Sequence, residues 1–357
     1  MRFFKKHIHT IRHALVLFFH HNALSLNFKN VTALSNFYNL PKAKGIPEYN
    51  LLVILGPTAT GKTTLAAHLA ACLGGEVISA DSRQVYRDMN IGTGKDLEDY
   101  VVDGITIPVH LTDIADAGTQ YNVYEYKRDF LKVLSDLRSR DIFPVLCGGS
   151  GLYIEAVIRD YRLIEVPLNE PLRAELKGKS LDELTEILKT FKSNLHNITD
   201  IVNEKRAIRA IEIEEYYLRL QDHPLPRSLS LTLPPLRPLV VGVHFDVETR
   251  RRRITERLHQ RLSQGMIEEV EGLLHAGIAP EALTYYGLEY KFITLYLTGA
   301  LSLEEMTGKL NIAIHQFAKR QMTWFRRMER EGTVIHWIDG NLPLAEKVEK
   351  VTELLAG

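Results

Sequence analysis

Apolar and polar positions alternate with two different periods in the first part of the chain. Short apolar runs at 51–55, 76–80 and 143–147 are typical of buried strands, whereas the spacing at 64–73 and 121–140 is that of helices. Strands that alternate with helices predict an α/β fold, with a parallel sheet covered by helices on both faces. Ligands of such folds bind at the carboxyl ends of the strands, so the chemistry is expected where these apolar runs stop.

The pattern changes after residue 151. From 152 to 235 the apolar spacing is helical, and the segment ends in a proline-rich stretch at 223–238 that predicts a connector. The apolar run at 239–245 returns to the sheet, and Asp246 is placed to cap the basic helix after it. The predicted parts are an N-terminal extension at 1–48, a core at 49–151 and 236–330 with C-terminal helices, a helical insertion at 152–235, and a C-terminal tail at 331–357.

The composition is that of an ordinary globular protein. The 357 residues are 45% hydrophobic and 25% charged, which is enough chain for two domains or for one domain with a large insertion. Lys plus Arg equals Asp plus Glu at 44 each, so net charge alone indicates neither a nucleic acid nor a membrane as partner. Cys72 and Cys147 are too few for a disulfide framework or a structural zinc site, which favours a reducing compartment. No apolar run approaches the roughly 18 residues of a membrane span, so no membrane partner is expected.

The first 48 residues differ from the rest. They are basic and rich in histidine, and they contain no acidic residue before Glu48. This composition partly fits an organellar transit peptide, although serines are few. The alternative is a disordered or wrongly started bacterial N-terminus. We expect a cytoplasmic protein, or a mitochondrial one if the extension is a transit peptide.

The segment "GPTATGKT" lies between the first strand and the first helix. It matches the phosphate-loop pattern G-x-x-x-x-G-K-[ST] in the context that the pattern requires. Successive backbone N–H groups and the helix N-terminus form an anion cradle there, Lys62 reaches the outer phosphate oxygens, and the Thr63 hydroxyl can ligate Mg²⁺. A di- or triphosphate is therefore expected at this loop. The predicted contacts are Gly56, Thr58, Ala59, Thr60, Gly61, Lys62, Thr63 and Thr64.

Polar residues also follow the second and third apolar runs. The run at 76–80 stops at Asp81, and a Gly-Thr-Gly-Lys cluster follows at 92–95. Phosphate-loop enzymes can place a charged residue here to hold the acceptor, but Asp81 could instead cap a helix in "SRQVYRDM". The glycines of "GGSG" at 148–151 would let the backbone approach a ligand, or they form a tight strand-to-helix turn. These residues alone do not decide between the readings.

Six motifs in order carry a resemblance to a known family. They are "GPTATGKT", "ISADSRQVYRDMNIGTGKD", "PVLCGGSGLYIEAV", "RAIRAIEI", "RRRITERLHQRLSQGMIEEV" and "AKRQMTWFRR". From about 51 to 330 the chain resembles the tRNA dimethylallyltransferases, which prenylate N6 of adenosine 37 beside the anticodon and release diphosphate. The resemblance implies a P-loop-kinase-like core whose loop holds dimethylallyl diphosphate, and a helical insertion that clasps the anticodon stem-loop. Eukaryotic members often carry a zinc finger after the catalytic domain, but here no cysteine follows Cys147. This favours a bacterial-type enzyme in the cytoplasm. We expect the enzyme to be a monomer.

The resemblance also implies roles for individual residues. Asp81 aligns with the family's general base, Ser150 stands where the family has threonine, and Lys62 and Arg253 complete the catalytic set. Arg253 and Arg257 match R-I-x-x-R, in which an arginine contacts the diphosphate, although a solvated charged helix is the alternative for this arginine-rich segment. Lys95 could add a further charge. The candidates for tRNA contact are Ser82, Arg83, Gln84, Lys205, Arg206, Arg209, Lys319, Arg320 and Arg326.

Two further points bear on the RNA side of this interpretation. The Asn-Asp pair expected before the "R-x-x-R-A" motif reads Val202-Asn203, so a tRNA or capping contact could be lost. Trp324 and Phe325 could stack on bases, but aromatics at helical spacing usually pack inward, so we expect them in the core.

Three other functions remain compatible with the phosphate loop. An adenylate isopentenyltransferase shares the chemistry but acts on free AMP, ADP or ATP, and it would not need the basic helices from 200 to 330. A small-molecule kinase would need an adenine site and a lid arginine pair, which we do not identify. An RNA-binding module without turnover would not need Lys62, Thr63 and Asp81 together.

Overall fold

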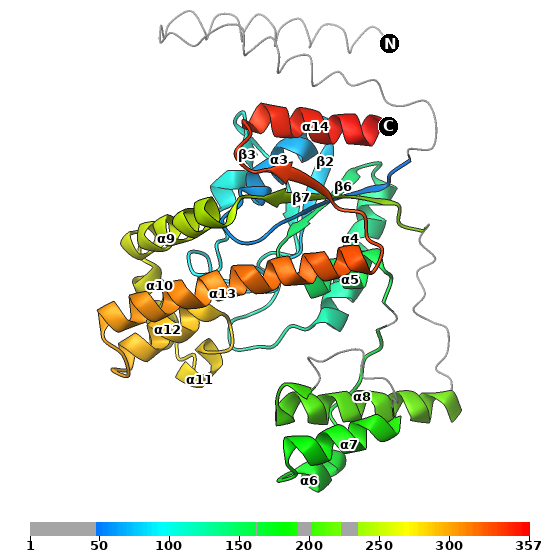
Figure 1. Cartoon of the computed structure of the whole chain (residues 1–357), viewed down its shortest axis with the longest axis vertical. Coiled ribbons are helices and arrows are strands. Elements are labelled where there is room, and N and C mark those ends of the chain that lie inside the picture. Colours follow the sequence, from blue (N-terminus) through cyan, green and yellow to red (C-terminus); the bar gives the residue numbers. More distant parts are fainter. Residues whose placement is uncertain (1–47, 162, 192–200, 223–234) are drawn as a thin grey trace, which may run out of the picture. The chain divides into compact units, whose positions relative to one another are not determined.

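The computed structural model describes residues 48–161, 163–191, 201–222 and 235–357 (Figure 1). The N-terminal extension, apart from its last residue, and most of the proline-rich connector lie outside these ranges. Within the described residues, no helix has both the length and the apolar character that a membrane crossing requires.

A six-stranded parallel sheet forms the centre of the core, which confirms the predicted α/β class. Its order is β5-β2-β6-β1-β7-β8. The strands are β1 (Leu51–Leu55), β2 (Gly75–Ser79), β5 (Val109–His110), β6 (Phe143–Gly148), β7 (Pro238–His244) and β8 (His336–Asp339). The central strands are buried on both faces, which is why they read as continuous apolar runs.

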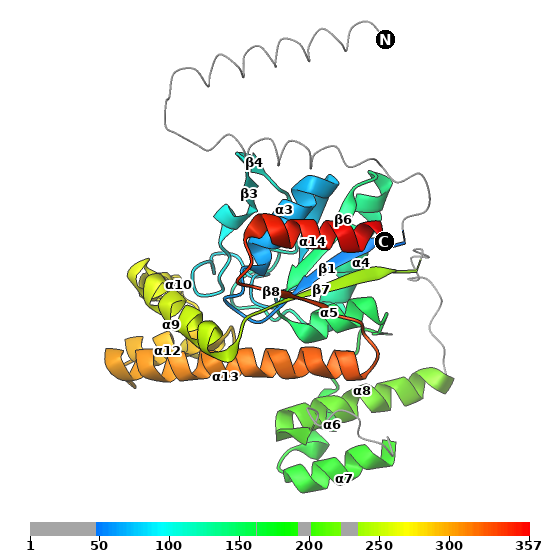
Figure 2. The same ribbon diagram turned by 45° about the horizontal axis from the view of Figure 1, so that its top comes forward.

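Alternate residues of β1 enter different apolar clusters. Leu51, Val53 and Leu55 pack on one side, where helices α4 (Val123–Ser139), α5 (Gly151–Ile158) and α13 (Leu303–Arg330) supply partners. Leu52 and Ile54 pack on the other side, against α3 (Lys62–Leu73) and α14 (Leu344–Ala356). Figures 1 and 2 show α14 beside α3 in both views. The sheet is therefore covered on both faces, as the alternating pattern predicts.

The C-terminal segment corrects one expectation. Residues 331–357 are not a tail, because they add strand β8 to the edge of the sheet and helix α14 to its face. Ile338, Val348 and Val351 are buried in the same cluster as Leu52. Their burial makes this segment a part of the core.

The predicted insertion begins later than expected. Helix α5 packs on α4 and α13 and belongs to the core, so the insertion proper contains α6 (Glu170–Leu176), α7 (Leu181–Phe191) and α8 (Glu204–Asp222). These three helices share a small apolar cluster. Its buried members are Leu176, Leu184, Leu188, Ala207 and Ile211. The insertion thus has a small apolar core of its own, separate from the two clusters beside the sheet.

The chain returns from β7 into a group of helices. Asp246 accepts a hydrogen bond from the Thr249 amide at 2.9 Å, which confirms it as the cap of α9 (Val247–Ser263). Helices α10 (Met266–His275), α11 (Pro280–Leu283) and α12 (Leu288–Leu297) follow and lead into the long α13. Between β2 and β5 the chain forms a short 3-10 helix (Leu97–Tyr100) and the hairpin of β3 (Val101–Val102) and β4 (Ile105–Thr106).

Candidate active site

A large cavity lies at the carboxyl ends of β1, β2 and β6. Its volume is about 940 Å³, and its walls come from the loops after these three strands, from α9 and α13, and from the loop before α12. Arg206 of α8 also lines it. The topology explains the position, because parallel strands end at the same edge of the sheet and their loops meet there.

The loop from Gly56 to Gly61 has the backbone of an anion cradle. Ala59 and Gly61 adopt left-handed conformations, with φ of 63° and 73°, which turn the chain sharply into α3. Among the described residues, no side chain caps the N-terminus of α3 at Gly61, so its first amides are available to a ligand. A side chain at Gly56 would place its Cβ 2.7 Å from the Val243 carbonyl oxygen, so glycine is required there.

Lys62 begins α3 and lines the cavity. Burial lowers the pKa of its ammonium group, and the nearby carboxylate of Asp81 opposes this effect. Burial also raises the pKa of the neighbouring Cys147 thiol to about 12, so this group is protonated at neutral pH. A desolvated cation at a helix N-terminus is an arrangement that an anionic ligand stabilises.

Two loop hydroxyls have partners within the protein. Thr60 is 1% exposed and donates to the Pro57 carbonyl at 2.9 Å, and Thr64 donates to Asp99 at 3.1 Å. Burial raises the pKa of the Asp99 carboxyl. Thr63 lines the cavity beside them. The hydroxyls of Thr60 and Thr64 therefore bond within the protein, although both residues are among the predicted diphosphate contacts.

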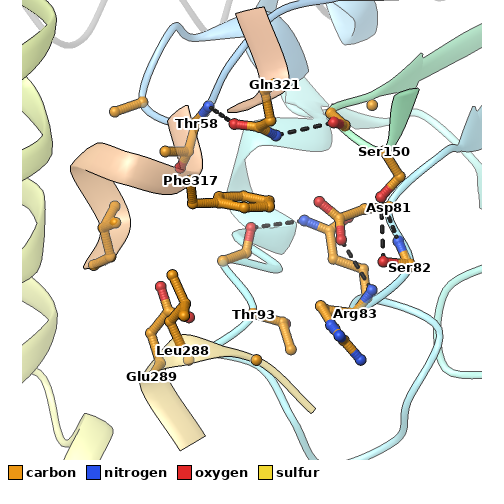
Figure 3. Close-up of a pocket in the computed structure, with 18 of the residues that line it drawn as sticks. Thr58, Asp81, Ser82, Arg83, Thr93, Ser150, Leu288, Glu289, Phe317 and Gln321 are labelled. Atoms are coloured by element: carbon orange, nitrogen blue, oxygen red, sulfur yellow. Dashed lines mark hydrogen bonds between the residues drawn. The ribbon is translucent and has the colours of Figure 1, made fainter. Parts of the chain in front are cut away.

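Asp81 follows β2 and faces the same cavity. Its Oδ1 accepts a hydrogen bond from the Arg83 amide at 2.9 Å (Figure 3). The segment after Asp81 forms turns, so the alternative in which Asp81 caps a helix is wrong. The short Asp81–Arg83 contact fixes the carboxylate within the turn.

Ser150 holds the Asp81 turn from the neighbouring strand. Its Oγ accepts from the Ser82 amide at 3.0 Å and lies 3.3 Å from the Ser82 hydroxyl, while its own amide donates to the Ala80 carbonyl at 3.2 Å (Figure 3). A Cβ at Gly148 would lie 2.1 Å from the Ala80 carbonyl oxygen. The close approach that Gly148 permits is thus to the end of another strand, whereas Gly149 and Gly151 permit the close approach of Gln321 and Trp324 of α13.

Gln321 of α13 is a site residue that sequence reasoning missed. It is 8% exposed, its Oε1 accepts from the Thr58 amide at 3.0 Å, and its Nε2 donates to the Gly149 carbonyl at 2.9 Å. Figure 3 shows this amide between the two loops. One side chain therefore ties the loop after β1 to the loop after β6.

A carboxylate of α10 organises the loop from 90 to 96. Glu269 accepts hydrogen bonds from the amides of Asn90, Ile91 and Gly92 at 2.7–3.0 Å, and from the Tyr290 hydroxyl at 2.6 Å. This arrangement presents Thr93, Gly94 and Asp96 to the cavity.

Lys95 of this loop and the nearby Gln84 form hydrogen bonds to other parts of the protein. Lys95 is 4% exposed and donates to the Tyr86 carbonyl at 2.7 Å and to Asn90 and Asp113, so it does not supply the cavity charge proposed for it. Gln84 donates to the Gly94 carbonyl at 2.9 Å and accepts from Ser79 at 3.2 Å. Both ends of the Gln84 amide are therefore engaged in holding the loops together.

Three arginines of α9 line the cavity. Arg253 donates from Nε to the Ala59 carbonyl at 3.0 Å and lies over the Phe245 ring, at 4.7 Å from its centroid. Arg257 and Arg261 share Asp96, at 2.8 Å and 3.0 Å. The solvated-helix alternative is therefore wrong for Arg257 and Arg261, which are held by Asp96 at the cavity wall, whereas Arg253 is exposed apart from its bond to the loop.

The chain is similar to proteins of one known family. Residues 84–328 match the family model of IPP transferases. The tRNA dimethylallyltransferase 2 of Bacteroides fragilis is 56% identical over 310 residues, covering 87% of this chain and 99% of that protein. The tRNA dimethylallyltransferase 1 of Parabacteroides distasonis is 55% identical over 307 residues, covering 86% and 98%. This chain belongs to the IPP transferase family.

Solved structures of the family share the fold. The tRNA isopentenylpyrophosphate transferase of Bacillus halodurans is 31% identical with a TM-score of 0.62, covering 86% of this chain and 96% of that one. A eukaryotic dimethylallyltransferase acting on tRNA is 21% identical with a TM-score of 0.65, covering 82% and 74%, and shares the fold. The sequence resemblance to this family is confirmed.

In this member of the IPP transferase family, the basic residues expected at RNA differ in their surroundings. Lys205, Lys319 and Arg326 are exposed, and Arg320 is exposed beside Phe317 at the cavity. Arg209 is instead engaged within the insertion: it donates to the Val166 carbonyl at 2.7 Å and pairs with Glu212 at 3.0 Å.

Two other expectations on the RNA side can be compared with the structure. Asn203 accepts from the Arg206 amide at 3.0 Å at the start of α8, so the Val202-Asn203 departure keeps a cap. Phe325 is fully buried, as expected. Trp324 is partly buried, donates to Glu155 at 2.9 Å and contributes to the cavity wall.

Proposed function

We propose that this protein transfers the dimethylallyl group of dimethylallyl diphosphate to N6 of adenosine 37 in tRNA and releases diphosphate. The observation that carries the proposal is that a phosphate-loop cradle and the carboxylate of Asp81 face one cavity with basic residues around it. An anion site alone fits many enzymes. The carboxylate of Asp81, at the end of a second strand, faces the same cavity. Such a group fits a transfer reaction in which the acceptor must lose a proton.

The donor's diphosphate is assigned to the loop after β1. Its oxygens would meet the first amides of α3 and the Lys62 ammonium, with Arg253, which is bonded to the loop, and Arg257 as further cations of the cavity lining. Negative charge develops on this leaving group as the allylic carbon–oxygen bond breaks. Because the donors are held in place before the reaction, they stabilise that charge without reorganising.

Mg²⁺ is the metal we propose at this end of the cavity. The oxygen donors there are the Thr63 hydroxyl and the Asp99 carboxylate, and hydroxyl and carboxylate oxygens suit this hard cation. Thr63 would hold the ion together with oxygens of the donor. When bound, Mg²⁺ would supply positive charge that neutralises the departing diphosphate.

Asp81 is proposed as the acceptor of the N6 proton. The exocyclic amine is a poor nucleophile because its lone pair is delocalised, so a positioned base assists as the carbon–nitrogen bond forms. The carbon–oxygen bond of the donor breaks, the proton of N6 moves to Asp81, and no covalent intermediate with the protein is required. Ser150 acts on this residue indirectly, because it fixes the Ser82 amide beside it.

The RNA would approach from the side of the exposed cations. Lys205 and Arg206 of the insertion and Lys319, Arg320 and Arg326 of α13 are the cations that we assign to tRNA phosphates, and Arg83 lies at the cavity. We place the enzyme in the cytoplasm and propose that it acts as a monomer, which binds one anticodon stem-loop.

The choice of acceptor tests the proposal. Purified protein is incubated with dimethylallyl diphosphate, Mg²⁺ and either an anticodon stem-loop bearing A36-A37-A38 or free AMP. We expect prenylation of A37 in the stem-loop at a much higher kcat/KM than of AMP. Faster prenylation of AMP would contradict the proposal and favour an adenylate isopentenyltransferase. ATP-dependent phosphorylation at a comparable rate would favour a small-molecule kinase. Membership of the IPP transferase family does not favour a kinase.

A further inference from the structure

Two aromatic side chains at the cavity are exposed although they are large and apolar. Tyr285, in the loop before α12, is 46% exposed, and Phe317 of α13 is 40% exposed. Both line the cavity at the strand ends, and Figure 3 shows the Phe317 ring directed into it. Exposed aromatic rings in a cavity are candidates for contact with a ligand, because their burial on binding is favourable.

Each ring has an arginine over it. The guanidinium carbon of Arg83 lies 5.3 Å from the centroid of the Tyr285 ring, and that of Arg320 lies 5.9 Å from the Phe317 ring. Both arginines also line the cavity, together with Lys291 and Arg206. Each exposed ring therefore has a guanidinium group beside it, which favours an anionic partner that can stack.

Both rings sit on rigid supports. Tyr285 contacts the ring of the buried Tyr286 edge to face at 5.6 Å, and the Tyr286 hydroxyl accepts from the Gly118 amide at 2.6 Å and donates to the Thr119 carbonyl at 2.7 Å. Phe317 lies one helical turn before Gln321, whose amide is held at both ends. A ring with a fixed position loses little entropy when a base stacks on it.

We propose that Tyr285 and Phe317 are stacking surfaces for unpaired nucleobases of the RNA acceptor, with Arg83 and Arg320 beside them for the adjoining phosphates. The inference rests on the proposed function, and it adds two recognition residues that the sequence motifs do not mark. Proteins read single-stranded RNA by stacking splayed bases on aromatic rings and guanidinium planes, and an adenine that reacts at N6 must leave its own stack. A cavity with two such rings supplies replacement stacking for bases displaced in this way.

The test combines variants of the protein with gaps in the RNA. Tyr285→Leu and Phe317→Leu keep apolar bulk but remove the aromatic face, whereas Tyr285→Phe and Phe317→Tyr keep it. Ile312→Ala serves as the control, because Ile312 is 59% exposed on the same helix as Phe317 and does not line the cavity. Dissociation constants are measured for an anticodon stem-loop and for a series in which each loop nucleotide in turn lacks its base.

We expect each leucine variant to weaken binding of the intact stem-loop by about 5- to 150-fold, and the aromatic variants and the control to bind as the wild type does. The loss should vanish for the one stem-loop that lacks the stacked base, because the contact is then already absent. The KM for dimethylallyl diphosphate should stay unchanged.

Two results would overturn the inference. One is an equal loss of affinity for every RNA of the series, which indicates a general effect on structure. The other is a raised KM for the donor with unchanged RNA affinity, which places the ring against the prenyl group. A wild-type enzyme that neither binds nor prenylates the stem-loop would instead contradict the proposed function itself, so the two failures are distinguishable.

Discussion

The cations of this protein divide into an anchored set at the donor end of the cavity and an exposed set on α8 and α13. Lys62 is desolvated, Arg257 and Arg261 share Asp96, and Arg253, although exposed, is bonded to the loop backbone. Lys319 and Arg326, by contrast, are exposed on α13. Anchored cations suit a small ligand with one fixed position, whereas exposed cations act on a polyanion through its summed field. A protein with no net charge can therefore offer two different environments for phosphate groups.

The largest loss is expected for Lys62→Ala. Its ammonium is proposed to stabilise the departing diphosphate, so kcat/KM for the donor should fall by roughly 10²–10³, while RNA affinity stays unchanged. Steady-state kinetics with varied donor and a binding assay with the stem-loop separate the two quantities. Lys319→Ala is the matched control, because it removes an exposed lysine and should spare donor kinetics. A comparable loss in RNA binding for Lys62→Ala would break the division into two sets.

Gln321→Leu tests whether the anchoring of the donor loop matters. Leucine leaves the Thr58 amide and the Gly149 carbonyl without their partner, which costs about 1–3 kcal/mol of stability. The loop should shift, and single-turnover prenylation should slow by roughly ten- to a hundredfold. Gln316→Leu on the exposed side of the same helix is the control. If the Gln321→Leu protein is destabilised but its single-turnover rate equals that of the wild type, the two hydrogen bonds of Gln321 serve only the stability of the fold.

Substitution of Glu212 in the insertion is expected to have a smaller effect, on the stability of the fold alone. Burial raises the pKa of its carboxyl, but hydrogen bonds from Arg173, the Asn169 amide and Arg209 outweigh this and lower the pKa to about 2. A depressed pKa stabilises the fold above the unfolded value of about 4.3, and that contribution is lost as pH falls toward 2.

Glu212→Gln should therefore lower the melting temperature at pH 7 and flatten the decline of stability between about pH 5 and pH 2. Thermal unfolding at several pH values measures both. The exposed Glu186→Gln on α7 is the control and should change neither. A decline as steep as that of the wild type in Glu212→Gln would show that other carboxyl groups set the acid sensitivity.

The smallest effects are expected for single exposed cations. Lys319→Gln and Arg326→Gln should each weaken stem-loop binding only a few-fold, and each should reduce the slope of log K against log salt by about 1. Lys350→Gln on α14 is a matched control on the other face of the sheet. An unchanged slope in both α13 variants would remove these residues from the RNA-binding surface.

The sequence predicts this fold where local patterns carry the information. β1, the loop and α3 were found by apolar periodicity and the spacing of two glycines and a lysine. β8 was missed because a strand of four residues is recognisable only once the edge of the sheet is known. The apolar spacing of Leu344, Val348, Val351 and Leu355 was a signal for α14 that could have been used.

The candidate site was predictable to a similar extent. Asp81 and Ser150 stand out because polar residues follow buried strands. Gln321 follows no strand. It lies within the motif "AKRQMTWFRR", but its partner Thr58 is 263 positions away and only the packing of α13 brings the two together. The prediction that Lys95 adds a charge at the site is wrong for a related reason, because its burial depends on residues distant in the sequence, such as Asp113.

Asp81 is proposed to accept the N6 proton of the adenine that attacks the donor. In Asp81→Asn the amide oxygen can still accept from the Arg83 amide, so the turn should persist, but the side chain can no longer take a proton. Single-turnover prenylation of the stem-loop is compared in wild type, Asp81→Asn and the exposed control Asp88→Asn. We predict for Asp81→Asn a rate lower by at least ~10², with melting temperature and RNA affinity near those of the wild type. Near-normal single-turnover chemistry in well-folded Asp81→Asn protein would contradict the account.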